Sequence, residues 1–258
     1  MFDVYNEPLP VIFDIHTHIG ELPEGEEELW EFARDHHMRI AISSFDQANE
    51  FTQQPDFRKC VEYNDRAIEL AKRFPGLIFP FCFVNPLYGE KAISEIRRCV
   101  GDHGMVGIKL WLGRVCTDPS VAPIIEEAIS FGVPVLHHSW IREEMLAGES
   151  SPYDIAELGR RYPQLTVIMA HMGYRWRQGV AAIKDVPNVV TDCSGGDPEA
   201  GQIEYAVSML GADRVFYGSD APGRDVLCQV SKVTCADISS QDKEKILHKN
   251  AERLLHLL

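Results

Sequence analysis

The stretch FDIHTHIG, residues 13–20, closes the first apolar run of the chain with two histidines, His16 and His18. Side chains alternate along a strand, so these histidines point to one side, and Asp14 shares that side one layer deeper. An unsatisfied buried polar group costs about 1–3 kcal/mol, so buried imidazoles need partners, and a metal ion is one such partner. The stretch also bears on the fold, because an open doubly wound sheet usually places a glycine-rich phosphate turn here, and this sequence has none.

Eight short apolar runs, rich in β-branched and aromatic residues and bounded by turn residues, predict eight strands. Their starts recur at intervals of a few tens of residues, which is the length of a βα unit. The predicted strands are Val11–His16, Arg39–Ser44, Leu77–Val84, Met105–Leu110, Val133–His138, Thr166–His171, Asn188–Cys193 and Arg214–Ser219.

Apolar residues at intervals of three and four predict helices between several of these strands. The acidic run Pro23–Glu28 is interpreted as the solvated start of another helix, because carboxylates favour helix N-termini. Eight βα units predict a (β/α)8 TIM barrel of the α/β class, and no linker divides residues 1–258, so we expect one barrel domain. The predicted helices are Tyr63–Phe74, Lys91–Val100, Pro119–Ile129, residues 153–162, and Ser240 to the C-terminus.

The composition limits the partners of the chain. A net charge of −14 repels phosphate backbones, so nucleic acid is not an expected partner. The seven cysteines are scattered and form no CxxC pair, which is typical of reduced thiols in a cytoplasmic protein. The sequence shows neither a signal peptide nor an apolar run of the roughly 20 residues that a membrane helix needs. We therefore expect a cytoplasmic protein with a small-molecule substrate; a homodimer stays open.

Polar residues stand at the carboxyl ends of five predicted strands. The inward positions of such a barrel should be branched and apolar, and polar exceptions at these ends mark the catalytic face. Of the adjacent His137 and His138 only one can face inward, and we favour His138. The strand-end residues are His16, His18, Lys109, His137, His138, His171 and Asp220.

With these motifs the chain resembles the amidohydrolase superfamily, and within it the compact amidohydrolase-related group. That group includes hydrolases and lyases of the aminocarboxymuconate-semialdehyde decarboxylase type. In similar proteins the histidine of the fifth strand lies four residues after a proline, and counting from Pro134 gives His138. The resemblance rests on DIHTH (14–18), GIKL (107–110), PVLHH (134–138), AHMG (170–173), YGSDAP (217–222) and NAERLL (250–255).

The resemblance implies that His16, His18, His138 and Asp220 bind one divalent metal, and that His171 holds the attacking water or polarises the substrate. Three neutral imidazoles and one carboxylate suit Zn²⁺, with Mn²⁺ as the alternative. Zinc lowers the pKa of a bound water towards about 7, and Asp220 can then accept a proton and pass it on.

The expected function is a metal-dependent hydrolase that uses metal-activated water on an amide, lactone or related carbonyl bond of a small molecule. The first alternative is a metal-dependent, non-oxidative decarboxylase of a small carboxylated substrate. The second is a barrel that binds a metal or ligand without catalysis. A nuclease is disfavoured, because similar nucleases carry a glutamate on the fourth strand, where this chain has Lys109.

Lys109 also bears on the number of metals. Two-metal amidohydrolases often bridge their metals with a carbamylated lysine on this strand, but GIKL is common in the compact group without that modification. We therefore expect Lys109 to face the substrate or to be structural, and no second metal.

Aromatic and cationic residues follow the fifth, sixth and eighth predicted strands. Arginines there can clamp a carboxylate with two hydrogen bonds, and tryptophans can cover a ring. The substrate-binding candidates are Lys109, Trp140, Arg142, Arg175 and Arg224, with Trp176 and Arg177 beside them in the sequence.

Overall fold

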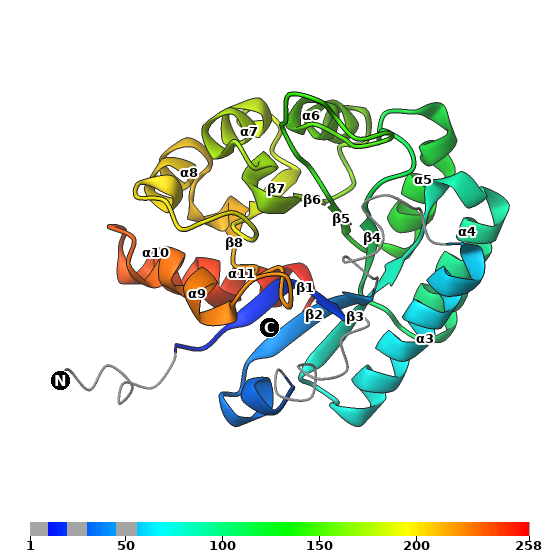
Figure 1. The fold of residues 1–258 in the computed structure, drawn as a ribbon, viewed down its shortest axis with the longest axis horizontal. Coiled ribbons are helices and arrows are strands. Elements are labelled where there is room, and N and C mark those ends of the chain that lie inside the picture. Colours follow the sequence, from blue (N-terminus) through cyan, green and yellow to red (C-terminus); the bar gives the residue numbers. More distant parts are fainter. Residues whose placement is uncertain (1–9, 20–29, 45–55, 258) are drawn as a thin grey trace.

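Eight parallel strands form the centre of the computed structural model, which describes residues 10–19, 30–44 and 56–257. Figure 1 shows the strands as an inner ring with the helices outside it. Each strand pairs with the next one along the chain, from the first to the eighth. The strands are β1 Phe13–Ile19, β2 Arg39–Ser44, β3 Ile78–Phe83, β4 Gly107–Leu110, β5 Val135–His137, β6 Val167–Met169, β7 Val189–Asp192 and β8 Val215–Phe216.

The ring closes between β1 and the segment that follows β8. Thr17 forms a parallel bridge with Ala221, and the backbone N–H of His18 donates to the carbonyl of Ala221 at 2.7 Å. Below this, the N–H of Ile15 donates to the carbonyl of Tyr217 at 3.1 Å. Parallel pairing around the whole ring confirms the predicted (β/α)8 TIM barrel.

Several strands are shorter than predicted, because the chain turns sharply where polar residues begin. His171 and Met172 have φ angles of 61° and 50°, and Asp220 has a φ of 66°. Such angles are costly for residues other than glycine and cluster at functional sites. The sixth strand therefore ends before His171, which was predicted to lie on it, whereas β8 ends at Phe216, before the turn at Asp220.

The helices alternate with the strands, and most predictions for them are confirmed within a few residues. The helix predicted at Tyr63 begins earlier, because the Asp56 side chain caps it by accepting from the N–H of Lys59. The predicted acidic helix start, Pro23–Glu28, lies outside the described residues. The helices are α3 Phe57–Arg73, α4 Glu90–Ile96, α5 Ala122–Phe131, α6 Pro152–Arg161, α7 Trp176–Ile183, α8 Gln202–Leu210, α9 Val226–Thr234, α10 Ser240–Glu244 and α11 Asn250–Leu254.

Short π-helical and 3₁₀ segments complete the helical layer. Arg97–Asp102 extends α4, and Lys245–Lys249 joins α10 to α11, so the predicted C-terminal helix is one path with a π-helical middle. Single 3₁₀ turns precede or replace helices at Pro86–Tyr88, Pro119–Val121, Ala170–Gly173 and Ala212–Arg214. Within the described part of the chain, every helix is too short or too polar to cross a bilayer.

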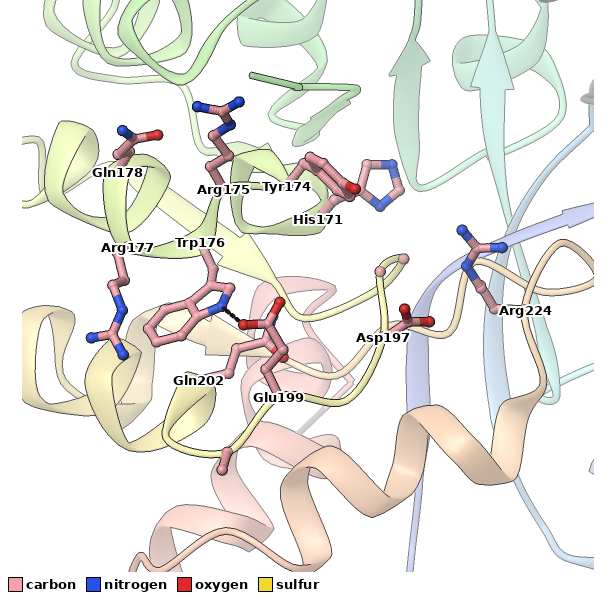
Figure 2. A pocket seen from close by; sticks show the side chains of 13 residues that line it. His171, Tyr174, Arg175, Trp176, Arg177, Gln178, Asp197, Glu199, Gln202 and Arg224 are labelled. Atoms are coloured by element: carbon pink, nitrogen blue, oxygen red, sulfur yellow. Dashed lines mark hydrogen bonds between the residues drawn. The ribbon is translucent and has the colours of Figure 1, made fainter. Parts of the chain in front are cut away.

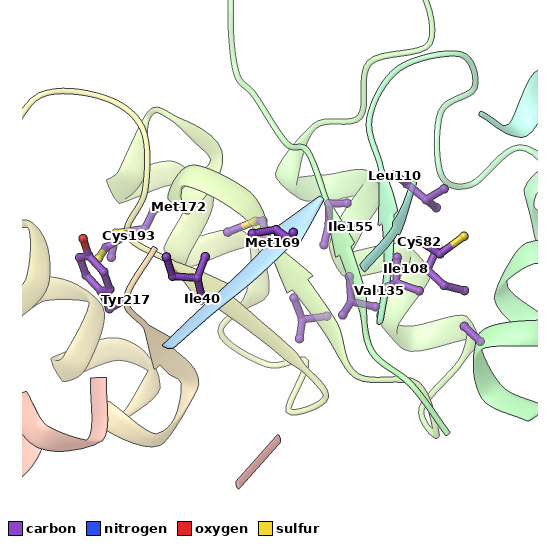
Figure 3. Close-up of a cluster of buried hydrophobic side chains, with 14 of the residues drawn as sticks. Ile40, Cys82, Ile108, Leu110, Val135, Ile155, Met169, Met172, Cys193 and Tyr217 are labelled. Carbon is purple, nitrogen blue, oxygen red and sulfur yellow. The ribbon is translucent and has the colours of Figure 1, made fainter. Parts of the chain in front are cut away.

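Two apolar layers hold the barrel together. The larger lies between strands and helices, and Figure 3 shows Ile40, Ile108, Val135 and Met169 of the strands in it with Ile155 of α6. Burying a side chain of this size contributes about 1.5–3 kcal/mol. This layer fixes the strands and hence the residues at their ends.

The second layer fills the barrel interior and includes Phe13, Phe81 and Phe216. Aromatic rings thus occupy places where branched residues were expected. The ring of Phe81 fits because its neighbour on β4 is Gly107. A Cβ at position 107 would lie 2.6 Å from the ring, so any other residue there would clash with it. Ala251 of α11 belongs to this layer too. Because these apolar side chains fill the barrel interior, polar groups are accommodated at the carboxyl ends of the strands.

Strand β1 carries an irregularity that corrects one prediction. Asp14 is in register with Ile40, whereas His18 is in register with Ser43, and the register shifts between Asp14 and Thr17. Ile40 packs outside the ring. Asp14 therefore does not lie one layer beneath the histidines on the same side. Such bulges re-aim side chains, and here the bulge separates the side of Asp14 from the side that His16 and His18 share.

Candidate active site

Three side chains bring donor atoms to one point at the carboxyl end of the barrel. His16 Nε2 lies 3.1 Å from His18 Nε2, and Asp220 Oδ1 lies 3.2 Å from His18 Nε2 and 3.8 Å from His16 Nε2. Both imidazoles are buried, and 16% of the Asp220 side chain is exposed. β1 supplies the histidines, and the turn after β8 supplies the carboxylate.

The second ring nitrogen of each histidine shows which nitrogen carries the proton. His18 Nδ1 lies 3.1 Å from the carbonyl oxygen of Ser43, which can only accept, so Nδ1 carries the proton. His16 Nδ1 lies 2.9 Å from Asp192 Oδ2, and Lys109 Nζ, a donor only, lies 2.8 Å from His16 Nε2. Both Nε2 atoms therefore present lone pairs to the common point.

This arrangement fits a divalent cation. Two nitrogen lone pairs and a carboxylate oxygen face one another, and a positive charge makes such an approach favourable. The Lys109 ammonium supplies one such charge from the side of His16, and a divalent cation between the three atoms would supply more. Ligands about 2.1 Å from one ion lie about 3.0 Å apart in octahedral and about 3.4 Å apart in tetrahedral geometry. The observed separations of 3.1, 3.2 and 3.8 Å approach these values. Hydrogen bonds on Nδ1 are also the usual support of histidines that bind metals.

His138 lies beside this group, but its ligand atoms are not within 4.8 Å of all three donor atoms. Its ring centroid is 5.2 Å from that of His171, and its Nε2 lies 3.1 Å from Glu149 Oε1. The neighbouring His137 instead directs Nδ1 to the carbonyl oxygen of His138 at 2.6 Å. The choice of His138 over His137 agrees with these contacts, and its role as a metal ligand stays a prediction.

His171 stands next to the donor group, in the 3₁₀ turn after β6. Its ring stacks against that of His16 with centroids 4.9 Å apart, and its Nδ1 lies 2.9 Å from Ser194 Oγ. Burial lowers the pKa of His171 to about 3, so the imidazole is neutral. The turn places a neutral, titratable ring at the edge of the site.

Lys109 of β4 brings a cationic side chain to the donor group. Its side chain is buried, and burial lowers its pKa to about 8. Its ammonium group offsets part of the negative charge of Asp220 and Asp192. Burial would raise the pKa of Asp220, but His171, His18 and His16 hold it well below its usual range. Asp220 is therefore ionised, as a metal ligand must be.

A cavity of about 720 Å³ opens beside His171, above β6, β7 and β8. Figure 2 shows Trp176 and Glu199, joined by a hydrogen bond of 2.9 Å, at one end, and Asp197 and Arg224 at the other. A cavity of this size admits a small organic substrate.

Lys109, one of the predicted substrate-binding residues, lies against His16 instead of the cavity, and the other four divide into two groups. Arg175 and Arg224 line the cavity and are exposed. Arg142 instead donates to Glu149 Oε1 at 2.7 Å. Trp140 stacks between His138 and Tyr174, with ring centroids at 5.7 and 4.0 Å. Trp140 and Arg142 therefore support His138 and do not line this cavity.

Four residues that contact the site were missed by the sequence analysis. Asp192 and Ser194 follow the same strand-end rule as the histidines, and the polar residues of TDCSG (191–195) could have revealed them. Ser43 stands at the end of β2, where a serine carries little signal. Glu149 lies in an irregular loop eleven residues after His138, and no pattern in the sequence indicates its contact.

Comparisons with known proteins show the family of the chain. The family model Amidohydro_2, described as amidohydrolase, matches residues 13–257. The chain belongs to the amidohydrolase family. It is also 27% identical over 214 residues to 2-amino-3-carboxymuconate-6-semialdehyde decarboxylase of Dictyostelium discoideum. That match covers 65% of this chain and 58% of the relative.

Solved structures show the same fold. The 2,6-dihydroxybenzoate decarboxylase from Rhizobium has a TM-score of 0.73 at 20% identity, covering 96% of this chain and 99% of that one. The dihydroxybenzoic acid decarboxylase from a Polaromonas species, solved with manganese and 2-nitroresorcinol, has a TM-score of 0.76 at 18% identity, covering 96% and 98%. The family-model match over residues 13–257 confirms the predicted resemblance to the amidohydrolase superfamily, and the chain is an enzyme of that superfamily. Hydrolysis as its main reaction is not confirmed.

Proposed function

We propose that the protein is a metal-dependent, non-oxidative decarboxylase of a small carboxylated molecule. The observation that carries the proposal is the meeting of His16 Nε2, His18 Nε2 and Asp220 Oδ1, within 3.1–3.8 Å, beside a cavity lined by His171 and Arg224. The decarboxylases to which the chain is similar support this reaction over hydrolysis.

His16, His18 and Asp220 would hold the divalent ion, and His138 would complete the set. Nitrogen and carboxylate donors suit Zn²⁺ and Mn²⁺ alike, and manganese is the ion in the compared Polaromonas structure. When bound, the ion supplies a positive charge that fixes and polarises an oxygen of the substrate. Arg224, across the cavity, would pair with an anionic group of the same molecule.

Decarboxylation needs one proton at the carbon that bears the carboxylate. The new bond joins that proton to carbon, the bond from carbon to the carboxylate breaks, and its electron pair restores the conjugated system as carbon dioxide leaves. His171 lines the cavity and is titratable, so it is the group proposed to carry the proton. The acid form of the substrate thus yields the protonated product and carbon dioxide without net uptake of water.

Hydrolysis of an amide or lactone is the second candidate, because the family model that matches the chain is named for amidohydrolases. The same donors would then orient a water, and Asp220 would take its proton. The two reactions differ in one measurable respect. Hydrolysis adds an oxygen atom from water to the product, whereas decarboxylation adds only a hydrogen.

The test uses purified protein loaded with Mn²⁺ or Zn²⁺. Carboxylated aromatics, 2,6-dihydroxybenzoate among them, are supplied with ¹³C in the carboxylate, and a parallel panel of lactones and amides is supplied in H₂¹⁸O. Release of ¹³CO₂ that is absent from H171N protein supports decarboxylation. Incorporation of ¹⁸O from the second panel, with no ¹³CO₂ from the first, would overturn it in favour of hydrolysis.

A further inference from the structure

Asp192, the last residue of β7, binds two parts of the site with its two oxygens. Oδ2 lies 2.9 Å from Nδ1 of His16. Oδ1 accepts from the backbone N–H of His171 at 2.9 Å and from the backbone N–H of Ser194 at 3.0 Å. The carboxylate is fully buried. One side chain therefore joins His16, the proposed metal ligand on β1, to the turn that carries His171.

The hydroxyl of Ser194 determines where the proton of His171 sits. Ser194 Oγ donates to Asp192 Oδ1, an atom that already accepts two N–H groups and has no proton to give. A hydroxyl has one proton, so Oγ can only accept from Nδ1 of His171, 2.9 Å away. His171 therefore carries its proton on Nδ1, and its Nε2 presents a lone pair.

Contacts of the loop around Ser194 fix the position of Ser194 beside His171. The buried Lys232 of α9 donates to the carbonyl oxygens of Cys193 and Gly195, which flank Ser194. Gly195 has a φ of 63°, and a Cβ on it would lie 2.6 Å from Nδ1 of His171. Only glycine admits the ring this close, so the contact between Ser194 and His171 is a fixed part of the fold.

We infer that Asp192 and Ser194 form a positioning pair that sets the tautomers of His16 and His171 together. Neutral His171 then cannot donate a hydrogen bond from Nε2 to a substrate oxygen, as a polarising group would have to. Nε2 of His171 is instead left to accept a hydrogen bond from a substrate group. The pair thus fixes which nitrogen of His171 faces the cavity as an acceptor and gives His16 the lone pair that a metal ligand needs.

The test reads the tautomer directly, by ¹⁵N spectroscopy of histidine-labelled, metal-free protein, with the His171 signals identified from the H171N variant. Wild-type protein should show a protonated Nδ1 and an unprotonated Nε2 on His171. In S194A the His171 signals should shift towards a mixture of tautomers, and turnover should fall by about 10–100-fold. Ser194 Oγ also lies 3.0 Å from Nδ1 of His16, so S194A should weaken Mn²⁺ binding by a few-fold. D192N, which loses the carboxylate charge beside the same nitrogen, should lose about 10–100-fold in affinity.

Ser139 offers a matched control, because it is a buried serine beside His138 whose hydroxyl has no hydrogen-bond partner among the described residues. S139A should leave the His171 signals unchanged. A wild-type His171 protonated at Nε2, or an S194A protein with wild-type His171 signals, would overturn the inference. The wild-type spectrum decides even if S194A fails to fold. The inference rests on the proposed site, but the spectrum requires no turnover, so failure of decarboxylation alone leaves it standing.

Discussion

Glu149 accepts a hydrogen bond from Nε2 of His138 at 3.1 Å, although an irregular loop separates the two residues. The same oxygen accepts from Arg142 at 2.7 Å, and the other oxygen accepts from the backbone N–H of Leu146. With its proton on Nε2, His138 keeps the lone pair of Nδ1 for a metal ion. Glu149 therefore determines which nitrogen of His138 can act as a ligand.

Removal of this carboxylate should weaken metal binding. We expect E149A to lose about 10–100-fold in Mn²⁺ affinity, and E149Q to lose less, because an amide oxygen can still accept one hydrogen bond. Titration with Mn²⁺, followed by the paramagnetic signal of the free ion, measures both. E157Q, at an exposed glutamate of α6, is the control and should match wild type. An E149A protein with wild-type affinity would show that His138 needs no such support.

The number of metal ions can be counted by elemental analysis. One equivalent per chain is expected in wild-type protein and about none in the H16A/H18A double variant, because two of the converging donors are gone. H171N should keep its metal and lose about 10²–10⁴-fold in turnover, as expected for a proton-transfer residue. Two equivalents in wild-type protein, reduced to one in K109A, would instead support a carbamylated Lys109.

The stability of the metal-free protein should depend on pH through buried histidines. Burial lowers the pKa of His18 to about 3, of His137 to about 4 and of His171 to about 3, from 6.5. The unfolded chain therefore binds more protons below pH 6.5, and the stability present above that pH is lost as the pH falls towards 4. Each histidine contributes up to about 1.4 kcal/mol per pH unit.

Asp14 opposes this trend. Burial raises its pKa from 3.8 to about 6, so its contribution is lost as the pH rises through that range. The destabilising effect of three histidines on acidification exceeds the stabilising effect of one carboxyl. The free energy of unfolding should therefore decrease as the pH is lowered from 6.5 to 5. Urea denaturation of chelator-treated protein measures it, and H137Q should show a shallower dependence. A free energy that rises on acidification would contradict the neutral state of these rings.

The barrel could be predicted because its signals are local and repeated. Each strand is a short apolar run, and polar residues at the ends of such runs stand out against a packed interior. His16, His18 and Asp220 come together in the structure for this reason. The identity of the metal could not be predicted in the same way. The donor set suits several divalent ions, and a related structure holds manganese and not the expected zinc.

What the sequence could not show depends on backbone geometry. The alternation rule placed Asp14 beneath the histidines, but a bulge shifts the register of β1 and moves it to the other side of the strand. The positive φ angle of His171 ends β6 early, and Asp220 takes a positive φ angle in the turn after β8. No pattern of residues in the sequence predicts either angle. Glu149 reaches His138 only because its loop folds back, a contact that periodicity cannot reveal.

The arginines of the cavity give the prediction that bears most directly on the substrate. Arg224 and Arg175 both line the cavity, and Arg224 lies near His171 and Asp197 in Figure 2. If a carboxylated substrate occupies this space, R224A should raise KM about tenfold with little change in kcat, because a charge-assisted hydrogen bond to an exposed side chain is lost. R175A should raise KM less, because Arg175, the N-cap residue of α7, points away from Asp197 and Arg224 in Figure 2. R160A, on the exposed face of α6, serves as the control and should leave KM unchanged. An unchanged KM in both R224A and R175A would remove the anion-binding role and leave the metal donors as the sole anchor for the carboxylate.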